Sequence, residues 1–247
     1  MIYNSGVTLS KIVDMSDNLP CKDCTSKCSS VFCDLTHDDL KKISDTKRCI
    51  TYSKGQTIFI ENTNPAGIFC VKQGKIKLTK NQENGRDQIF RFAKGGDLLG
   101  FRSFLSNQPY AVSAITLEES IVCYIPKESF YDTIKKSENL TGNLFTKLNH
   151  DLNFAEDRLS TISNKSLRER VAEALIIFEK TYGFLEDGKT INLQLSREEI
   201  AQFVGTATES LIRFLSEFYK DGIIELSGKK IKILDLKKLE KTANLSD

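Results

Sequence analysis

The stretch from residue 195 to 226, LSREEIAQFVGTATESLIRFLSEFYKDGIIEL, restricts the fold most, because it predicts a helix-turn-helix. Ser196 stands at the start of an apolar-periodic run and is followed three positions later by Glu199, the pattern of a capping box. Gly205 supplies the tight turn between two helices, and Gly222 ends the second helix. The residues expected to face inward are Ile200, Ala201, Val204, Leu211, Leu215 and Phe218.

The second predicted helix carries polar side chains near its N-terminal end, where a recognition helix meets base edges. Thr206 or Thr208 is expected to cap this helix. The following segment, IIELSGKKIKIL, predicts a β-hairpin that turns at Ser227 and Gly228. A helix-turn-helix with such a wing predicts a domain that binds double-stranded DNA. The residues expected to contact DNA are Arg197, Thr206, Thr208, Glu209, Ser210, Ile212 and Arg213.

The composition is that of an ordinary globular protein with room for two domains. The 247 residues carry a formal net charge of +2, and 40% of them are hydrophobic. The segment from Lys165 to Asp247 holds fourteen basic and fourteen acidic residues, so affinity for DNA must come from local placement of charge. No apolar run has membrane-spanning length and the start does not read as a secretory signal, which predicts a cytoplasmic protein without a membrane partner.

A long amphipathic helix is predicted from Asn139 to Ser163, followed by a hinge at residues 164–166 and a further helix in KSLRERVAEALIIFEKTYG. Its apolar stripe is narrow and bordered by charges, which is typical of a two-stranded coiled-coil seam. A helix-turn-helix usually binds pseudo-palindromic sites in pairs, so the stripe predicts a homodimer. A helix packed only on its own domain is the alternative. The expected interface consists of Leu148, Leu152, Ala155, Leu159 and Ile162.

Residues 50 to 130 alternate apolar and polar positions between regularly spaced glycines, which predicts an antiparallel sandwich or jelly roll. The sequence has no phosphate-binding loop, nucleophile elbow or paired metal-binding histidines, so no enzyme is expected. The predicted fold is α+β. Its parts are a cysteine-rich arm (1–36), a β-roll sensor domain (37–136), a dimerisation helix with hinge (137–164) and a winged helix-turn-helix (165–247).

Seven cysteines form a separate signal, and four of them crowd into PCKDCTSKCSSVFC. A cytoplasmic chain is not expected to use them in structural disulfides. Their density indicates thiolate ligation of an iron-sulfur cluster or zinc. Zinc is the weaker alternative, because Cys123 has no CxxC partner. Cys49 and Cys70 lie in apolar strand contexts and are expected to be inert core residues.

The segments GIFCVKQGKIKL, GGDLLGF, VCYIP and TATESLIRFLSEFYKDGIIEL follow one another as in the cyclic AMP receptor / fumarate-nitrate reduction (CRP/FNR) superfamily. The chain resembles this superfamily over nearly its whole length. The resemblance implies a transcription regulator with RNA polymerase as a partner. Cyclic-nucleotide binders of the family carry a Glu after the Gly-Asp-x-x-Gly turn and an Arg-Ser or Arg-Thr pair further on. Here Phe101 follows the turn and Tyr110-Ala111 replace the pair, so no cyclic nucleotide is expected, since burying an uncompensated phosphate is costly.

The oxygen-sensing branch of this superfamily binds a [4Fe-4S] cluster through three N-terminal cysteines and one on the late barrel strand. The resemblance implies that Cys21, Cys24 and Cys123 are ligands. The family leaves five residues after the second cysteine, whereas the gap here is three to Cys28 or eight to Cys33. We choose Cys28, because the shorter gap keeps the three loop thiolates in one compact turn, and Cys33 is the alternative.

The sequence thus predicts a homodimeric transcription regulator that senses oxygen or redox state through an N-terminal cluster. Three alternatives of the same fold remain. They are a cofactor-free regulator, a regulator with zinc or a reversible thiol switch, and a regulator that binds a small molecule in the barrel pocket.

Overall fold

The computed structural model describes residues 19–81 and 87–245. The chain divides into two compact units, each described by itself below. The first takes in the residues up to Leu78 together with Phe92–Leu148, and the second takes in Thr79–Arg91 and the residues from Asn149 onward. The division falls within the long helix α4 (Glu138–Asn164), which matches the predicted amphipathic helix.

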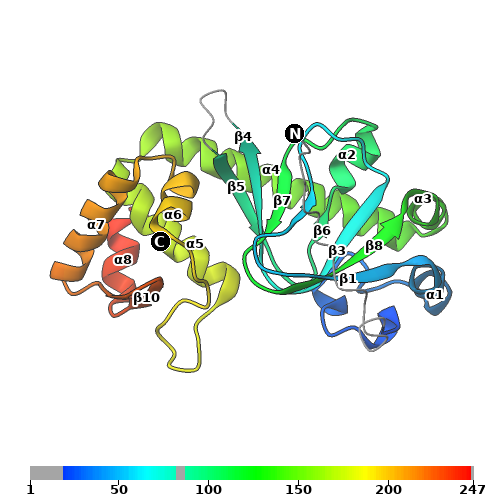
Figure 1. Ribbon diagram of the computed structural model, residues 1–247, viewed down its shortest axis with the longest axis horizontal. Helices are drawn as coiled ribbons and strands as arrows, with labels where there is room; N and C mark the ends of the chain where they lie inside the picture. Colours follow the sequence, from blue (N-terminus) through cyan, green and yellow to red (C-terminus); the bar gives the residue numbers. More distant parts are fainter. Residues whose placement is uncertain (1–18, 82–86, 246–247) are drawn as a thin grey trace, which may run out of the picture. The chain divides into compact units, whose positions relative to one another are not determined.

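Two four-stranded sheets form a sandwich, and all of it except the end of β4 and most of β5 belongs to the first unit (Figure 1). One sheet has the order β1 (Arg48–Tyr52), β8 (Ser120–Pro126), β3 (Gly67–Gln73), β6 (Leu98–Leu99). The other has the order β2 (Thr57–Phe59), β7 (Ser113–Thr116), β4 (Ile76–Asn81), β5 (Asp87–Ala93). Strand β8 pairs antiparallel with both β1 and β3. The α+β fold with an antiparallel sandwich is therefore confirmed.

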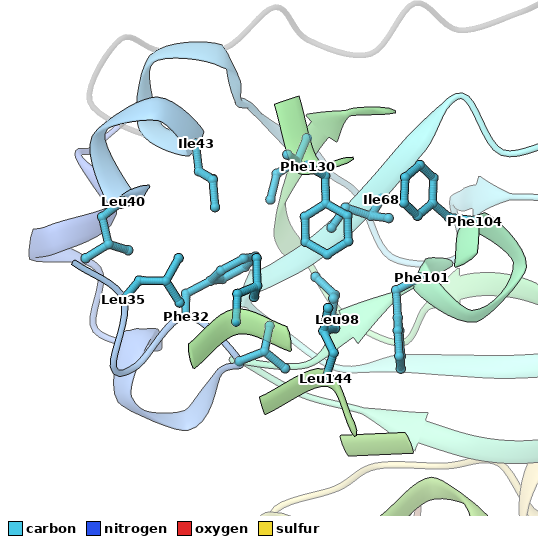
Figure 2. Close-up of a cluster of buried hydrophobic side chains, with 13 residues drawn as sticks. Phe32, Leu35, Leu40, Ile43, Ile68, Leu98, Phe101, Phe104, Phe130 and Leu144 are labelled. Atoms are coloured by element: carbon cyan, nitrogen blue, oxygen red, sulfur yellow. The ribbon is translucent and has the colours of Figure 1, made fainter. Parts of the chain in front are cut away.

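A hydrophobic cluster joins the cysteine-rich arm to the first sheet, as Figure 2 shows. Phe32 of the arm packs edge-on against Phe130, with ring centroids 6.4 Å apart. Helices α1 (His37–Thr46), α2 (Phe101–Ser106), α3 (Lys127–Lys136) and the first turns of α4 contribute the rest. Burial of one such aromatic ring contributes about 1.5–3 kcal/mol, so the arm is held on the sheet by its own core residues.

The second unit contains α5 (Leu167–Tyr182), α6 (Arg197–Val204), α7 (Thr208–Lys220), the hairpin β9 (Ile224–Ser227) and β10 (Lys230–Ile233), and α8 (Leu236–Thr242). The capping box of Ser196 and Glu199 is present. Gly205 ends α6 with φ +76°, a conformation that favours glycine. The six residues expected to face inward are all buried. The helix-turn-helix and its wing are therefore confirmed.

Two local predictions in this unit are wrong. Ala207, not Thr206 or Thr208, is the N-cap of α7, and no side chain caps that helix. The reason is that Thr206 still belongs to the end of α6, where its amide donates to the carbonyl of Ala201. The wing turns at Gly228 and Lys229, one residue later than predicted, because Ser227 pairs directly with Lys230.

No helix within the described residues is both long enough and apolar enough to cross a membrane.

Candidate functional site

The exposed face of α7 gathers several of the residues predicted to contact DNA. Burial of Leu211 and Phe218 turns Glu209, Ile212 and Arg213 outward. The Arg213 guanidinium lies over the ring of the neighbouring Phe214, 4.7 Å from its centroid. Glu209 and Arg213 stand one helical turn apart, which is the arrangement by which a recognition helix presents hydrogen-bonding groups to successive bases.

Arg197 lies at the start of α6 and contacts the wing. Its Nη2 donates to the carbonyl oxygen of Gly228 at 3.0 Å, so the guanidinium binds the tip of the wing. Arg197 is the first residue of α6, and the contact joins the start of the helix pair to the hairpin. Its role in the structure is therefore to position the wing.

Two arginines that sequence reasoning missed close the C-terminal end of α6. Arg158 of α4 donates to the carbonyl oxygen of Phe203 and lies over that residue's ring, 4.3 Å from the centroid. Arg170 of α5 donates to the carbonyl oxygen of Val204 at 3.4 Å. Cations are favourable at a helix C-terminus, where carbonyl groups lack intrahelical partners. These arginines fix the first helix of the pair, and only the tertiary structure reveals them.

A pocket in the first unit lies between the cysteine-rich arm and the sheet of β1, β8 and β3. Four cysteines line it: Cys21, Cys24, Cys70 and Cys123. The arm is held there by hydrogen bonds from the Cys21 amide to Ser44 Oγ (3.2 Å) and from Ser26 Oγ to the carbonyl of Lys72 (2.6 Å). The CxxC pair and two sheet cysteines therefore border the same space.

The turn at Gly95 and Gly96 makes room for the arm. A Cβ on Gly95 would lie 2.8 Å from Ser26 Oγ, and one on Gly96 would lie 2.7 Å from the carbonyl oxygen of Ser29. Neither distance is possible for a real side chain without displacement of the arm. The GGDLLGF motif thus serves here as the surface on which the cysteine-rich arm packs.

Three cysteines form a row across adjacent strands. Cys123 of β8 is directly opposite Cys49 of β1 and directly opposite Cys70 of β3. Cys49 and Cys123 are joined by a disulfide. The expectation that these cysteines form no disulfide is therefore wrong, and so is the description of Cys49 as inert. The reason is the register, which brings residues 74 positions apart in sequence side by side.

Cys28 and Cys33 do not line this pocket. Cys28 is exposed and Cys33 is half-buried, and desolvation together with the neighbouring Cys28 raises the pKa of the Cys33 thiol. With the disulfide in place, no group of three or more His, Cys, Asp or Glu side chains among the described residues is placed to hold a metal ion, and this includes the cysteines that line the pocket. The ligand set predicted from sequence, with Cys28 as its fourth member, is therefore not brought together.

The pocket combines buried thiols with a buried cation. Burial raises the pKa of the Cys21 and Cys70 thiols, and burial lowers the pKa of Lys47. Lys47 Nζ donates to the carbonyl of Leu19 at 2.9 Å and to Cys49 Sγ at 3.3 Å. Its charge lowers the pKa of both thiols, but burial outweighs this effect, so Cys21 and Cys70 are held as neutral thiols in this structure.

Aromatic side chains lie beside the Gly-Asp-x-x-Gly turn and line a pocket there. Tyr110 is buried, and its ring stacks on Phe59 with centroids 4.1 Å apart. A Cβ on Gly100 would lie 2.8 Å from this ring. Tyr110 therefore occupies the space beside the Gly-Asp-x-x-Gly turn.

The second half of α4 carries a continuous apolar stripe in solvent. The exposed fractions are 56% for Leu152, 67% for Leu159 and 44% for Ile162, and Ala155 between them is also exposed. Leu148 differs, because it packs partly against the core of the first unit. The sequence missed Phe145, which is 68% exposed and lies seven residues before Leu152 on the same stripe.

Two family profiles match the chain. Residues 49–137 match the family described as cyclic nucleotide-binding domain, and residues 169–242 match the Crp-like helix-turn-helix domain.

Among curated proteins, the transcriptional activator protein FnrA of Stutzerimonas stutzeri is 28% identical over 219 residues, which cover 87% of this chain and 88% of FnrA. The fumarate and nitrate reduction regulatory protein of Escherichia coli (strain K12) is 30% identical over 199 residues, covering 79% of this chain and 78% of that protein.

Among solved structures, FixK2 from Bradyrhizobium japonicum has a TM-score of 0.72 at 22% identity, over 82% of this chain and 100% of FixK2. A CRP/FNR-family transcriptional regulator from Thermus thermophilus has a TM-score of 0.68 at 22% identity, over 79% of this chain and 98% of that one. At 22% identity, both similarities establish the fold and nothing more.

The contact of Arg197 with the wing is testable. We expect Arg197→Ala to lower the free energy of unfolding by about 1 kcal/mol, since it removes one partly exposed, charge-assisted hydrogen bond. Hydrogen exchange should accelerate at β9 and β10. The matched control is Lys229→Ala, which removes an exposed cation from the same turn and should leave both measurements unchanged. Parent-like exchange in the wing of Arg197→Ala would show that this contact does not hold the hairpin.

Proposed function

This chain belongs to the CRP/FNR family of DNA-binding transcription regulators, and from that premise we propose that it couples DNA binding to oxygen or redox state through an N-terminal iron-sulfur cluster. One observation carries the proposal: the CxxC pair Cys21 and Cys24 and the late-strand Cys123 line one pocket. The names of the relatives support it, since two of the curated proteins are an FnrA activator and a fumarate and nitrate reduction regulator.

The donor chemistry of the pocket fits an iron-sulfur cluster. Such clusters are held by cysteine thiolates, and four cysteines border this space. Cys21 and Cys24 would hold the cluster from the arm, and Cys123 would hold it from β8. When bound, the cluster would supply the redox chemistry of the sensor. The protein's own part is to orient the thiols, to place Lys47 beside them and to close the pocket with Phe32 and Ile43.

The cluster is tested by anaerobic purification followed by iron and acid-labile sulfide counts and an absorption spectrum. We expect iron and sulfide in equal amounts, with both lost from Cys21→Ser and Cys24→Ser. Cys28→Ser and Cys33→Ser serve as matched controls from the same arm. Zinc without sulfide would assign a mononuclear site instead, and a protein free of metal that still responds to oxidants would remove the cluster from the proposal.

A thiol-disulfide switch is a second candidate, because the disulfide of Cys49 and Cys123 is already present in the sensor unit. Oxidation of two such thiols needs only an oxidant and no bound metal. The same metal counts separate the two candidates, since a pure thiol switch binds no iron in any state.

For the DNA-binding domain we propose that Glu209 and Arg213 contact bases directly. Arg213 suits guanine O6 and N7, and Glu209 suits the N4 amino group of cytosine. The exposed Ile212 offers a methyl contact to thymine but no hydrogen bond, so the outer base of the half-site should differ from the family's usual preference. Thr208 and Ser210 in the first turn of α7, and Thr206 in the turn before it, complete this surface. The proposed target is a pseudo-palindromic site bound by a homodimer in the cytoplasm, with RNA polymerase as a partner.

Replacement of Arg213 by alanine tests the base contact. We expect Arg213→Ala to weaken binding to the specific site by roughly 1–3 kcal/mol and to relax specificity at one position. The control Lys230→Ala removes an exposed wing cation and should weaken binding to specific and random DNA alike. If Arg213→Ala weakened binding to specific and random DNA equally, Arg213 would contact only phosphate and not a base.

We propose that a second copy of the chain covers the stripe of Leu152, Ala155, Leu159 and Ile162. Since the stripe carries no charge and Ala155 permits close approach, the metal-free protein should sediment as a dimer at micromolar concentration. We expect Leu159→Glu to raise the dissociation constant by roughly tenfold or more for each carboxylate buried in the seam. Asn153→Glu adds the same charge beside the stripe and should leave the dimer intact. A metal-free parent that sediments as a monomer would contradict a persistent dimer.

A further inference from the structure

The strand register gives Cys123 a partner that the linear sequence does not show. Cys70 of β3 and Cys123 of β8 are directly opposite each other in an antiparallel pair. Residues opposed in this way point to the same face, with Cβ atoms about 4.5–5.5 Å apart. Cys70 and Cys123 therefore form a cross-strand pair at the wall of the pocket, and Cys123 becomes a thiol once its bond to Cys49 is reduced.

The arm supplies a second pair on the other side of the same pocket. Cys21 and Cys24 flank the short 3-10 turn η2 (Cys21–Asp23), and both interact electrostatically with Cys70. A tetrahedral site for a thiophilic metal needs two pairs of thiolates, and a cubic iron-sulfur cluster also takes four. The pocket has this two-plus-two composition.

The charges around the pocket favour such a group. Four thiolates around a divalent metal or cluster core leave a net negative charge. Lys47 and Lys72 both line the pocket, and Lys47 interacts electrostatically with Cys21, Cys24 and Cys70. Burial still raises the pKa of Cys21 and Cys70, so these cations offset the cost of desolvating the thiolates only in part. Cys28 and Cys33 do not line this pocket with Lys47 and Lys72.

We propose that Cys21, Cys24, Cys70 and Cys123 form one tetrathiolate site, with Cys70 in the place that the sequence assigned to Cys28. The inference rests on the proposed function in that it names the ligands of the same sensor site. It differs from the family pattern, in which three of the ligands come from the N-terminal segment. Here two come from the arm and two from adjacent strands.

The disulfide sets the condition under which this site can bind metal. Cys123 cannot be a thiolate ligand while it is bonded to Cys49. Reduction by a dithiol breaks this S–S bond. The dithiol supplies two electrons and two protons, two cysteine thiols form, and the dithiol leaves as its own disulfide. The tetrathiolate site is therefore available only in the reduced protein, and ligation then displaces the thiol protons.

The experiment uses the full chain, reduced with a dithiol, freed of it under anaerobic conditions and titrated with Co²⁺ as the probe. The sulfur-to-cobalt charge-transfer absorption counts thiolates, and the visible bands report tetrahedral geometry. We expect a four-thiolate signature in the parent. Cys70→Ser should lose about a quarter of the charge-transfer intensity. Its Co²⁺ affinity should fall by roughly 10–100-fold or more. Loss of a residue that only hydrogen-bonds to a metal ligand already has an effect of this size, and Cys70 is proposed as a ligand itself. Cys28→Ser and Cys33→Ser should match the parent.

A measurement on the unaltered chain guards against a misfolded Cys70→Ser. Thiol alkylation followed by peptide mass mapping, with and without Co²⁺, shows which cysteines the metal protects from alkylation. We expect Co²⁺ to protect Cys21, Cys24, Cys70 and Cys123 and to leave Cys28 and Cys33 open to alkylation. The unreduced protein should bind no Co²⁺ at this site. Protection of Cys28 or Cys33 instead of Cys70, or full Co²⁺ binding before reduction, would overturn the tetrathiolate site.

The outcomes for the site and for the cluster are distinguishable. If the parent shows the Co²⁺ signature but never holds sulfide together with iron, the tetrathiolate site stands and the cluster fails. If the parent holds iron and sulfide and keeps them in Cys70→Ser but loses them in Cys28→Ser, the cluster stands and the assignment of Cys70 fails.

Discussion

The pairing of β8 between β1 and β3 is the constraint on which the sensor unit depends. Its backbone hydrogen bonds fix the register, and the register places Cys123 opposite Cys49 on one side and Cys70 on the other. The arm then packs over this face, held by Phe32 in the core and by the glycine turn at residues 95–96. A shift of one residue in the pairing would turn Cys123 to the opposite face of the sheet and remove it from the pocket.

The DNA-binding unit depends on a different kind of restraint. Arg158 and Arg170 hold the end of α6 from neighbouring helices, and Arg197 at the start of α6 contacts the wing. These cations donate to backbone carbonyl groups within the unit. The exposed Arg213 and Glu209 remain for base contacts. The charge balance of the domain therefore says little about the charge on its recognition face.

Sequence reasoning succeeded where a feature is local. The capping box of Ser196 and Glu199, the left-handed Gly205 and the periodic stripe of α4 each depend on residues within a few turns of one another. It failed at the N-cap of α7, because Thr206 remains committed to the preceding helix through a hydrogen bond that composition does not reveal. It also missed Phe145, since the face of α4 that the core covers is set by packing.

The sequence by itself determined the family, the order of the domains, the helix-turn-helix and the presence of a thiol-rich arm. Those features follow from motif spacing and hydrophobic period, which are properties of the linear chain. Only the tertiary structure decided which cysteines are neighbours. The contacts of Cys123 with Cys49 and Cys70 span 74 and 53 residues, and strand register alone brings them together. The physical reason is that a β-sheet pairs residues by backbone hydrogen bonding across strands, so neighbours in the site are distant in sequence.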